Sequence, residues 1–310
     1  MKHLLGDVLL TALLAMLCQC DTFSAMALFA HTQLEWLRRY VPLVNGAPSH
    51  DVFRNVFMRI KPEVLTDIMR QWASTAGAAA GQHVRIDGKV SRGTKATSNG
   101  PAQLHLLRAW GSEVGLSLGQ QACAQKSNEQ AALPQLLASL ELKGAVVSID
   151  AMAGHPEVAR TLHEAQADYL LALKKNEKTT FATVAAHFRG LSGQDGRLPA
   201  FRSPAETLHP GEDVPRHWPA EVSVHRSSEL SHGRYEEREV VACAVNDEWF
   251  PKNFLWYGLR SAVYVIRRCM RAGHQEETPT HEVHYYLSSL EPEAVKLGGC
   301  IRAHWAIENQ

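Results

Sequence analysis

Three acidic residues in different sequence contexts carry the clearest chemical signal in this chain of 310 residues. Asp87 and Asp150 each end a short run of apolar, often β-branched residues, and Glu308 stands close to the last residue, Gln310. Carboxylate oxygens are hard ligands that suit Mg²⁺, and a pair of such ions promotes phosphoryl transfer. The three residues therefore predict a site where divalent ions are held over a phosphodiester.

Asp87 and Asp150 are expected at the ends of two strands of one sheet. Alternation along residues 84–87 places Asp87 on the face opposite the apolar residues, and Gly88 then allows a turn or the close approach of a ligand. Residues 145–150 are apolar on both faces, which is typical of a central strand. Open α/β sheets bind ligands at the carboxyl ends of their strands, which is where both aspartates are expected. The two can act on the same ligand only if their strands are neighbours. A plain turn or cap residue is the alternative at each position.

The third acidic residue, Glu308, is expected on a final helix that begins near Pro292 and runs to the chain end. At about 100° per residue, one face of this helix collects Leu297, Ile301, His304, Trp305 and Glu308. That face is expected to pack on the sheet, where a metal shared with two aspartates would compensate the burial of a carboxylate. The alternative is a frayed terminal glutamate in water, because only Asn309 and Gln310 follow it.

The order of the predicted elements indicates an α/β fold with a mixed sheet. Strands are expected at 84–87, 104–110, 116–124, 145–150 and 168–173, with helices at 128–140 and 156–167. Three consecutive strands suit a meander, and the later strands would join it through right-handed crossovers. Residues 174–229 have weak periodicity and suggest an irregular insertion. Further strands are expected at 238–245, 263–269 and 281–287.

Residues 1–80 favour helix and are expected to form a separate N-terminal domain of short helices, ahead of a catalytic domain over 82–310. Four arginines of this region suit a small DNA-binding bundle resembling helix-turn-helix; they are Arg38, Arg39, Arg54 and Arg59. The alternative is a helical cap whose arginines are merely solvated. The apolar start looks like a signal peptide, but Asp7 interrupts it and no cleavage site follows, so we expect a buried helix. It is too short to span a bilayer, so no membrane partner is expected.

The charge balance argues against a general attraction to nucleic acid. Lysine plus arginine and aspartate plus glutamate number 32 each, so DNA would have to be held by local basic clusters. Such clusters follow two of the predicted strands and contain Lys89, Arg92, Lys95, Lys174, Lys175 and Lys178. Solvated loop charge is the alternative for these residues. Six scattered cysteines without a CxxC pair favour a reducing cytosol.

Eight short motifs occur in a fixed order along almost the whole chain, and together they are far more specific than any one of them. They are Pro48-Ser49-His50-Asp51-Val52-Phe53-Arg54, Ile86-Asp87-Gly88-Lys89, Lys126-Ser127-Asn128-Glu129, Ala132-Leu133-Pro134, Ile149-Asp150-Ala151-Met152, Tyr169-Leu170-Leu171-Ala172-Leu173-Lys174, His232-Gly233-Arg234 and His304-Trp305-Ala306-Ile307-Glu308-Asn309. In this order the motifs closely resemble the H-repeat-associated (ISAs-type) DDE transposases of bacterial insertion sequences.

This resemblance implies a ribonuclease H-like catalytic domain with a β-rich insertion at about 175–288, preceded by an N-terminal helical domain. It implies that Asp87, Asp150 and Glu308 are the acidic triad, which holds two Mg²⁺ or Mn²⁺ ions. The implied activity is metal-dependent strand cleavage and strand transfer at insertion-sequence ends, in the nucleoid of a bacterial cytoplasm. The implied partners are double-stranded DNA with terminal inverted repeats and further copies of the chain in a homo-oligomer. Arg234 matches a family motif and is expected to contact the DNA backbone or to act in the active site, with a tight hairpin as the alternative.

The chain also departs from the pattern of this family. The family usually begins upstream of Met1 and continues past the last motif with more helix and basic residues, so the resemblance implies truncation at the C-terminus. Ala153 stands where the family commonly has glycine. Two other interpretations stay open: a truncated, catalytically inactive remnant that retains the fold and DNA binding, and an unrelated metal-dependent phosphoesterase for small molecules. Basic residues beside the acidic ones favour DNA over a small substrate.

Overall fold

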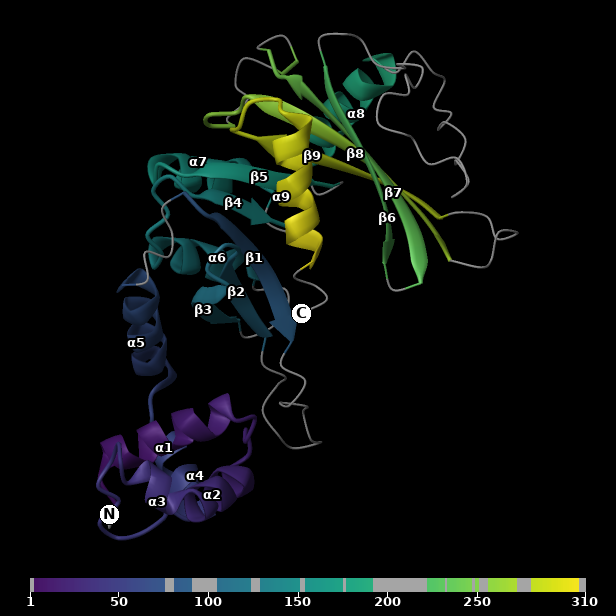
Figure 1. Ribbon diagram of the computed structural model, residues 1–310. Coiled ribbons are helices and arrows are strands. Elements are labelled where there is room, and N and C mark those ends of the chain that lie inside the picture. The colour runs from purple at the N-terminus through teal and green to yellow at the C-terminus, as the bar shows by residue number, and fades with distance from the viewer. Residues whose placement is uncertain are drawn as a thin grey trace, which may run out of the picture. The chain divides into compact units, whose positions relative to one another are not determined.

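The computed structural model of the chain describes residues 3–75, 81–90, 105–123, 129–150, 154–174, 177–191, 222–231, 233–246, 249–250, 256–271 and 280–306 (Figure 1). The chain divides into two compact units, residues 1–68 and 69–310. No helix of the described part is long and apolar enough to cross a membrane.

The first unit is helical. Its helices are α1 (Leu5–Leu17), α2 (Phe23–Thr32), α3 (Leu34–Leu37), α4 (His50–Phe57) and the start of α5 (Pro62–Thr75), which extends into the second unit. The expected buried helix at the chain start is confirmed along one face of α1, where Val8, Ala12 and Ala15 are fully buried. Asp7 is buried as well, and its Oδ2 accepts a hydrogen bond from the Leu43 amide at 3.1 Å. This bond satisfies the carboxylate that interrupts the apolar run.

The second unit is built on a mixed sheet with helices on both faces, so the predicted α/β architecture is confirmed. The strands of the described residues are β1 (His83–Val90), β2 (His105–Gly111), β3 (Leu116–Cys123), β4 (Val146–Ile149), β5 (Asp168–Leu173), β6 (Ser223–Ser231), β7 (Arg234–Ala244), β8 (Ser261–Arg271) and β9 (Thr280–Ser288). Their order in the sheet is β3-β2-β1-β4-β5-β9-β8-β7-β6. The first three form the expected antiparallel meander, and β4 and β5 then run parallel to β1.

Alternation of side chains along the strands divides the core into two layers. On β5, Tyr169 and Leu171 point to the layer that contains α6 (Glu129–Ala138), α7 (Pro156–Glu164) and α8 (Lys178–Leu191). Leu170, between them, points to the opposite layer, which contains α9 (Ala294–Ala306). Figure 1 shows α9, in yellow, lying across this face. Because β1 and β4 alternate in the same way, their polar residues face α9.

The prediction of an irregular segment over 174–229 is wrong at both of its ends. Helix α8 occupies Lys178–Leu191 and buries Val184, Ala185 and Phe188 at helical spacing. Strand β6 is an edge strand that pairs only with β7 among the described strands, so its mostly polar residues show little alternation. The glycine and proline residues of this segment lie mostly between the two elements, so its average composition did not indicate either of them.

Candidate functional site

Asp87 lies on β1, and Asp150 directly follows the neighbouring strand β4. β1 and β4 pair in parallel, and the last pair in their register joins Ile86 to Ile149. In the sequence, Asp87 comes directly after Ile86, and Asp150 comes directly after Ile149. Since neighbouring strands lie about 4.7–4.9 Å apart, the backbones of the two aspartates are close together. The expectation that their strands are neighbours is confirmed.

Asp87 lies within β1, and the expectation that it ends its strand is wrong. β1 continues to Val90 because its pairing with β2 continues on the other side, where Asp87 is opposite Arg108. The pairing with β4 stops one residue earlier, at Ile86. Asp87 therefore marks the point at which β1 loses β4 as a partner, and Arg108 is a cation that sequence reasoning did not place beside it.

A chain of buried polar groups begins two residues before Asp150. The Ser148 hydroxyl lies 2.8 Å from Nε2 of His83 on β1 and 2.9 Å from Nδ1 of His304 on α9. His83, Ser148 and His304 are only 7%, 2% and 9% exposed. The Arg85 guanidinium, on the same face of β1, donates to the carbonyl of Ala303 in the same turn of α9. We call the contacts of Ser148 with the two rings the Ser148 bridge.

Both imidazoles of the Ser148 bridge are neutral at pH 7. Burial lowers the pKa of His83 to about 4, with smaller contributions from His304 and Arg85. Burial also lowers the pKa of His304 to about 4; Arg85 acts in the same direction and Asp150 opposes it. A neutral imidazole has one donor and one acceptor nitrogen. The hydroxyl can therefore donate to one ring and accept from the other.

Lys174 holds positive charge at the acidic pair. Its Nζ lies 3.3 Å from Oδ1 of Asp150, and the two side chains are about half exposed. Exposed ion pairs contribute little to stability, so this ammonium can be displaced by another cation. Lys89 lies two residues beyond Asp87 and shares its face of β1.

The remaining predicted site residues are spread along the chain. Arg234 is exposed at the start of β7, which β5, β9 and β8 separate from β4, so the structure does not bring it to the acidic pair. Lys178 begins α8. The other predicted residues, Arg92, Lys95, Lys175 and Glu308, lie outside the described residues. Within the described residues, no three His, Cys, Asp or Glu side chains form a metal-binding group.

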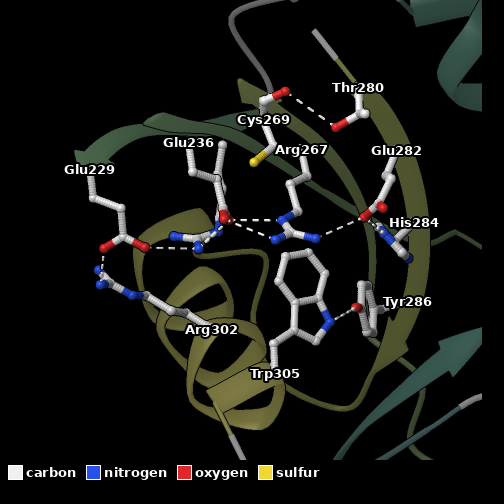
Figure 2. A network of polar contacts seen from close by, with 11 residues as sticks. Glu229, Glu236, Arg267, Cys269, Thr280, Glu282, His284, Tyr286, Arg302 and Trp305 are labelled. Atoms are coloured by element: carbon white, nitrogen blue, oxygen red, sulfur yellow. Dashed lines mark hydrogen bonds and ion pairs between the residues drawn. The ribbon is translucent and has the colours of Figure 1, made fainter. Parts of the chain in front are cut away.

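Charged contacts hold the other side of α9 against β6–β9 (Figure 2). Arg267 grips Glu236 through two hydrogen bonds of 2.9 Å and Glu282 through one of 3.0 Å. Arg302 of α9 pairs with Glu229, which also accepts from Arg238 at 2.9 Å. We call these six residues the ionic cluster.

An aromatic residue of α9 lies against the ionic cluster. The Trp305 ring is 5.9 Å from the guanidinium carbon of Arg238 and 5.7 Å from that of Arg267. Its Nε1 donates to the Tyr286 hydroxyl at 3.1 Å. Cations near the face of an indole ring are attracted to it. Trp305 therefore helps to anchor the end of α9 to the strands.

Comparison with known proteins gives one consistent family. The family described as "Transposase DDE domain" matches residues 78–310, and the family described as "DDE_Tnp_1-associated" matches residues 1–73. A Xanthobacter autotrophicus protein named "Uncharacterized protein in dhlA 3'region" is 37% identical over 86% of this chain and 82% of its own length. The H repeat-associated putative transposase YhhI of Escherichia coli K12 is 30% identical over 100% of this chain and 76% of its own.

A solved structure of the piggyBac transposase synaptic complex with hairpin DNA aligns with 95% of this chain and 55% of that chain. Its TM-score of 0.38 and identity of 11% are too low to carry a fold assignment. The family matches and the relatives agree with the ordered motifs in the sequence. The chain therefore belongs to the DDE transposase family, among its H-repeat-associated members.

Proposed function

We propose that this transposase cuts and joins DNA at insertion-sequence ends, with divalent metal held by Asp87, Asp150 and Glu308. The observation that carries the proposal is the position of Asp87 and Asp150, next to one another where β1 and β4 stop pairing. The same face of these strands contacts His304 of α9, and Glu308 follows His304 by four residues in the sequence. Membership of the DDE family supports the transposase function itself.

The arrangement of β3-β2-β1-β4-β5 supports a ribonuclease H-like core, which we propose for this part of the sheet. Three antiparallel strands come first, and two parallel strands follow on the far side of β1. Helices α6 and α7, which precede β4 and β5, pack on one face. Asp87 then lies on one central strand, β1, and Asp150 directly follows the other, β4.

The donor set at the acidic pair fits Mg²⁺ or Mn²⁺. Two carboxylates supply hard oxygen ligands, and Asp150 already binds an ammonium group in the structure. When bound, the metal would activate the attacking water or DNA 3′-hydroxyl and stabilise the leaving oxygen. Asp87 and Asp150 would hold the cation, and Lys174, displaced from Asp150, would be free to pair with a DNA phosphate. Lys89 and Arg108, which flank Asp87, add positive charge for the same phosphate backbone.

The test is Asp87→Asn, which replaces a carboxylate by a nearly isosteric amide that is a poor metal ligand. The substrate is supercoiled DNA that carries the terminal inverted repeats of the element, with Mg²⁺ present. We expect Asp87→Asn to abolish nicking while the thermal unfolding midpoint stays unchanged. Asp51→Asn is the control, because Asp51 is an exposed residue of the helical unit.

Retained nicking in Asp87→Asn would place the catalytic site elsewhere. If the unsubstituted chain binds this DNA without nicking it, the chain is an inactive remnant that retains DNA binding. We also propose that the active form is a homo-oligomer on paired ends. Light scattering of the chain with and without end DNA tests this, and a monomer in both samples would contradict it.

A further inference from the structure

Helix α9 is the element whose position matters most for the proposed site. Its apolar residues Leu297 and Ile301 are buried against the sheet. Apolar burial is not directional, so these contacts press the helix onto the sheet without fixing how far it slides along it. A slide by one residue moves a helix by about 1.5 Å. Other contacts must therefore set its register.

The Ser148 bridge has the directional contacts that apolar packing lacks. Its two distances, 2.8 and 2.9 Å, fall within the narrow range of a good hydrogen bond. Both contacts are buried, so water does not compete for the partners. Ser148 stands on the same face of β4 as Asp150, and Arg85 holds Ala303, next to His304, from β1. The bridge thus ties one turn of α9 to both strands of the acidic pair.

The ionic cluster is less able to set the register. Its links to α9 are the Arg302–Glu229 ion pair, in which the Arg302 side chain is 58% exposed, and the contacts of the Trp305 ring with Arg238 and Arg267. Arginine and glutamate have long side chains with several rotatable bonds, and they can follow a small shift of the helix. A serine hydroxyl on a central strand cannot, because it has a single rotatable bond to the backbone.

We infer that Ser148 is a positioning residue, whose hydroxyl fixes the register of α9 on β1 and β4 through His83 and His304. The consequence for metal binding rests on the proposed function, in which Glu308, four residues after His304 in the sequence, is a metal ligand together with Asp87 and Asp150. Ser148 itself contacts no substrate. Its effect on metal affinity is transmitted through the helix.

The test compares Ser148→Ala with Ser261→Ala in the full chain. Ser261 is a fully buried serine of β8, and its hydroxyl makes one hydrogen bond, to the Leu290 carbonyl at 2.8 Å. It therefore reports the effect of losing a buried hydroxyl elsewhere in the same sheet. The readouts are hydrogen exchange of α9 amides 301–306, Mn²⁺ affinity measured by titration with the metal alone, and the thermal unfolding midpoint.

We expect Ser148→Ala to speed exchange in α9 by about tenfold, as the loss of one buried hydrogen-bond partner shifts local opening. Mn²⁺ affinity should fall by about tenfold, as for other residues that orient metal ligands. Ser148→Thr, which keeps the hydroxyl, should restore both. Ser261→Ala should lower the unfolding midpoint without either effect. If Ser148→Ala does not fold, His304→Asn breaks the same link from the helix side and should give the same two changes.

Two results would overturn the inference. One is Ser148→Ala behaving like Ser261→Ala, with stability lowered and α9 exchange and Mn²⁺ affinity unchanged. The other is faster exchange in α9 with unchanged Mn²⁺ affinity, because the helix would then be positioned without a role at the metal site. If the unsubstituted chain binds no Mn²⁺, the proposed metal site fails, and exchange in α9 alone decides whether Ser148 sets the register.

Discussion

The two sides of α9 are held by opposite kinds of chemistry. Toward β1 and β4 the contacts are short and buried; they centre on the neutral Ser148 bridge, and the Arg85 guanidinium donates to the Ala303 carbonyl beside it. Toward β6–β9 the end of α9 meets alternating arginine and glutamate around Trp305 (Figure 2), while the Ala294 amide at its start donates to the Ser223 hydroxyl of β6 at 2.9 Å. Ion pairs give attraction over a range of geometries, whereas hydrogen bonds from short side chains fix one geometry. At the end of α9, where His304 and Arg302 lie, the charged side therefore supplies attraction and the Ser148 bridge sets the position of the helix.

The largest loss of stability should come from removing Glu236, at the centre of the ionic cluster. Glu236→Ala removes the carboxylate to which Arg267 donates two hydrogen bonds. The half-buried Arg267 guanidinium then keeps Glu282 as its acidic partner. Hydrogen bonds to charged groups contribute about 1.5–3 kcal/mol. Urea unfolding should show a loss of this size.

The control is Glu282→Ala, which removes the exposed partner of the same arginine. Exposed pairs contribute at most about 1 kcal/mol. Equal losses in the two variants would mean that the cluster acts as ordinary surface charge and does not anchor α9.

As the pH falls, the β1–β4 side of α9 should lose stability before the ionic cluster does. The folded pKa of His83 and of His304 is about 4, against an ordinary value of 6.5. Between these values the unfolded chain binds more protons than the folded chain, so the free energy of unfolding falls as pH falls from about 6.5 toward 4. Each pH unit over which one group differs between the two states is worth about 1.4 kcal/mol. The charged groups that face His304 are Asp150, which opposes the effect, and Arg85, which adds to it.

The ionic cluster should lose stability only at lower pH. Burial alone raises the pKa of Glu236, but hydrogen bonds and charge from Arg267 and Arg238 outweigh it and hold the pKa below the ordinary value of 4.5. Its contribution is therefore present above 4.5 and is lost as pH falls through the lower, folded value. Urea unfolding between pH 8 and 5 should show a fall that His83→Gln reduces and Glu236→Gln leaves unchanged. A flat profile would contradict neutral, buried imidazoles.

The smallest effect should come from salt. A double-mutant cycle on Arg302 and Glu229 should give a coupling of at most about 1 kcal/mol, and the coupling should shrink as NaCl rises from 0.05 to about 1 M. A cycle on Ser148 and His304 should give a coupling that salt does not change, because neither group is charged. Salt dependence of the second cycle would mean that His304 carries charge in the folded protein.

Much of the acidic pair could be predicted from sequence, because it depends on local patterns. Apolar runs that end at Asp87 and Asp150 identify strands, and the order of elements makes these strands neighbours. The Ser148 bridge could not be predicted, since its partners are 65 and 156 residues away and a serine in a strand has no distinctive pattern. Lys174 was predicted to contact DNA, and that role stays a prediction. Its pairing with Asp150 arises from the neighbouring ends of β4 and β5, which the sequence pattern does not specify.

The long sheet has a consequence for how the chain can be shortened. β9 joins the acidic strands to the later ones through a ladder with β5 that runs from Leu170 to Leu173. A chain without β6, β7 and β8 would leave β9 as a bare edge, with unpaired amides and carbonyls open to other strands. It would also strip Val240 and Val265 from beneath α9. The later strands therefore supply the surface on which the final helix packs. Removing them would expose a strand edge that can pair with other chains, and it would destabilise α9, which precedes Glu308 in the sequence.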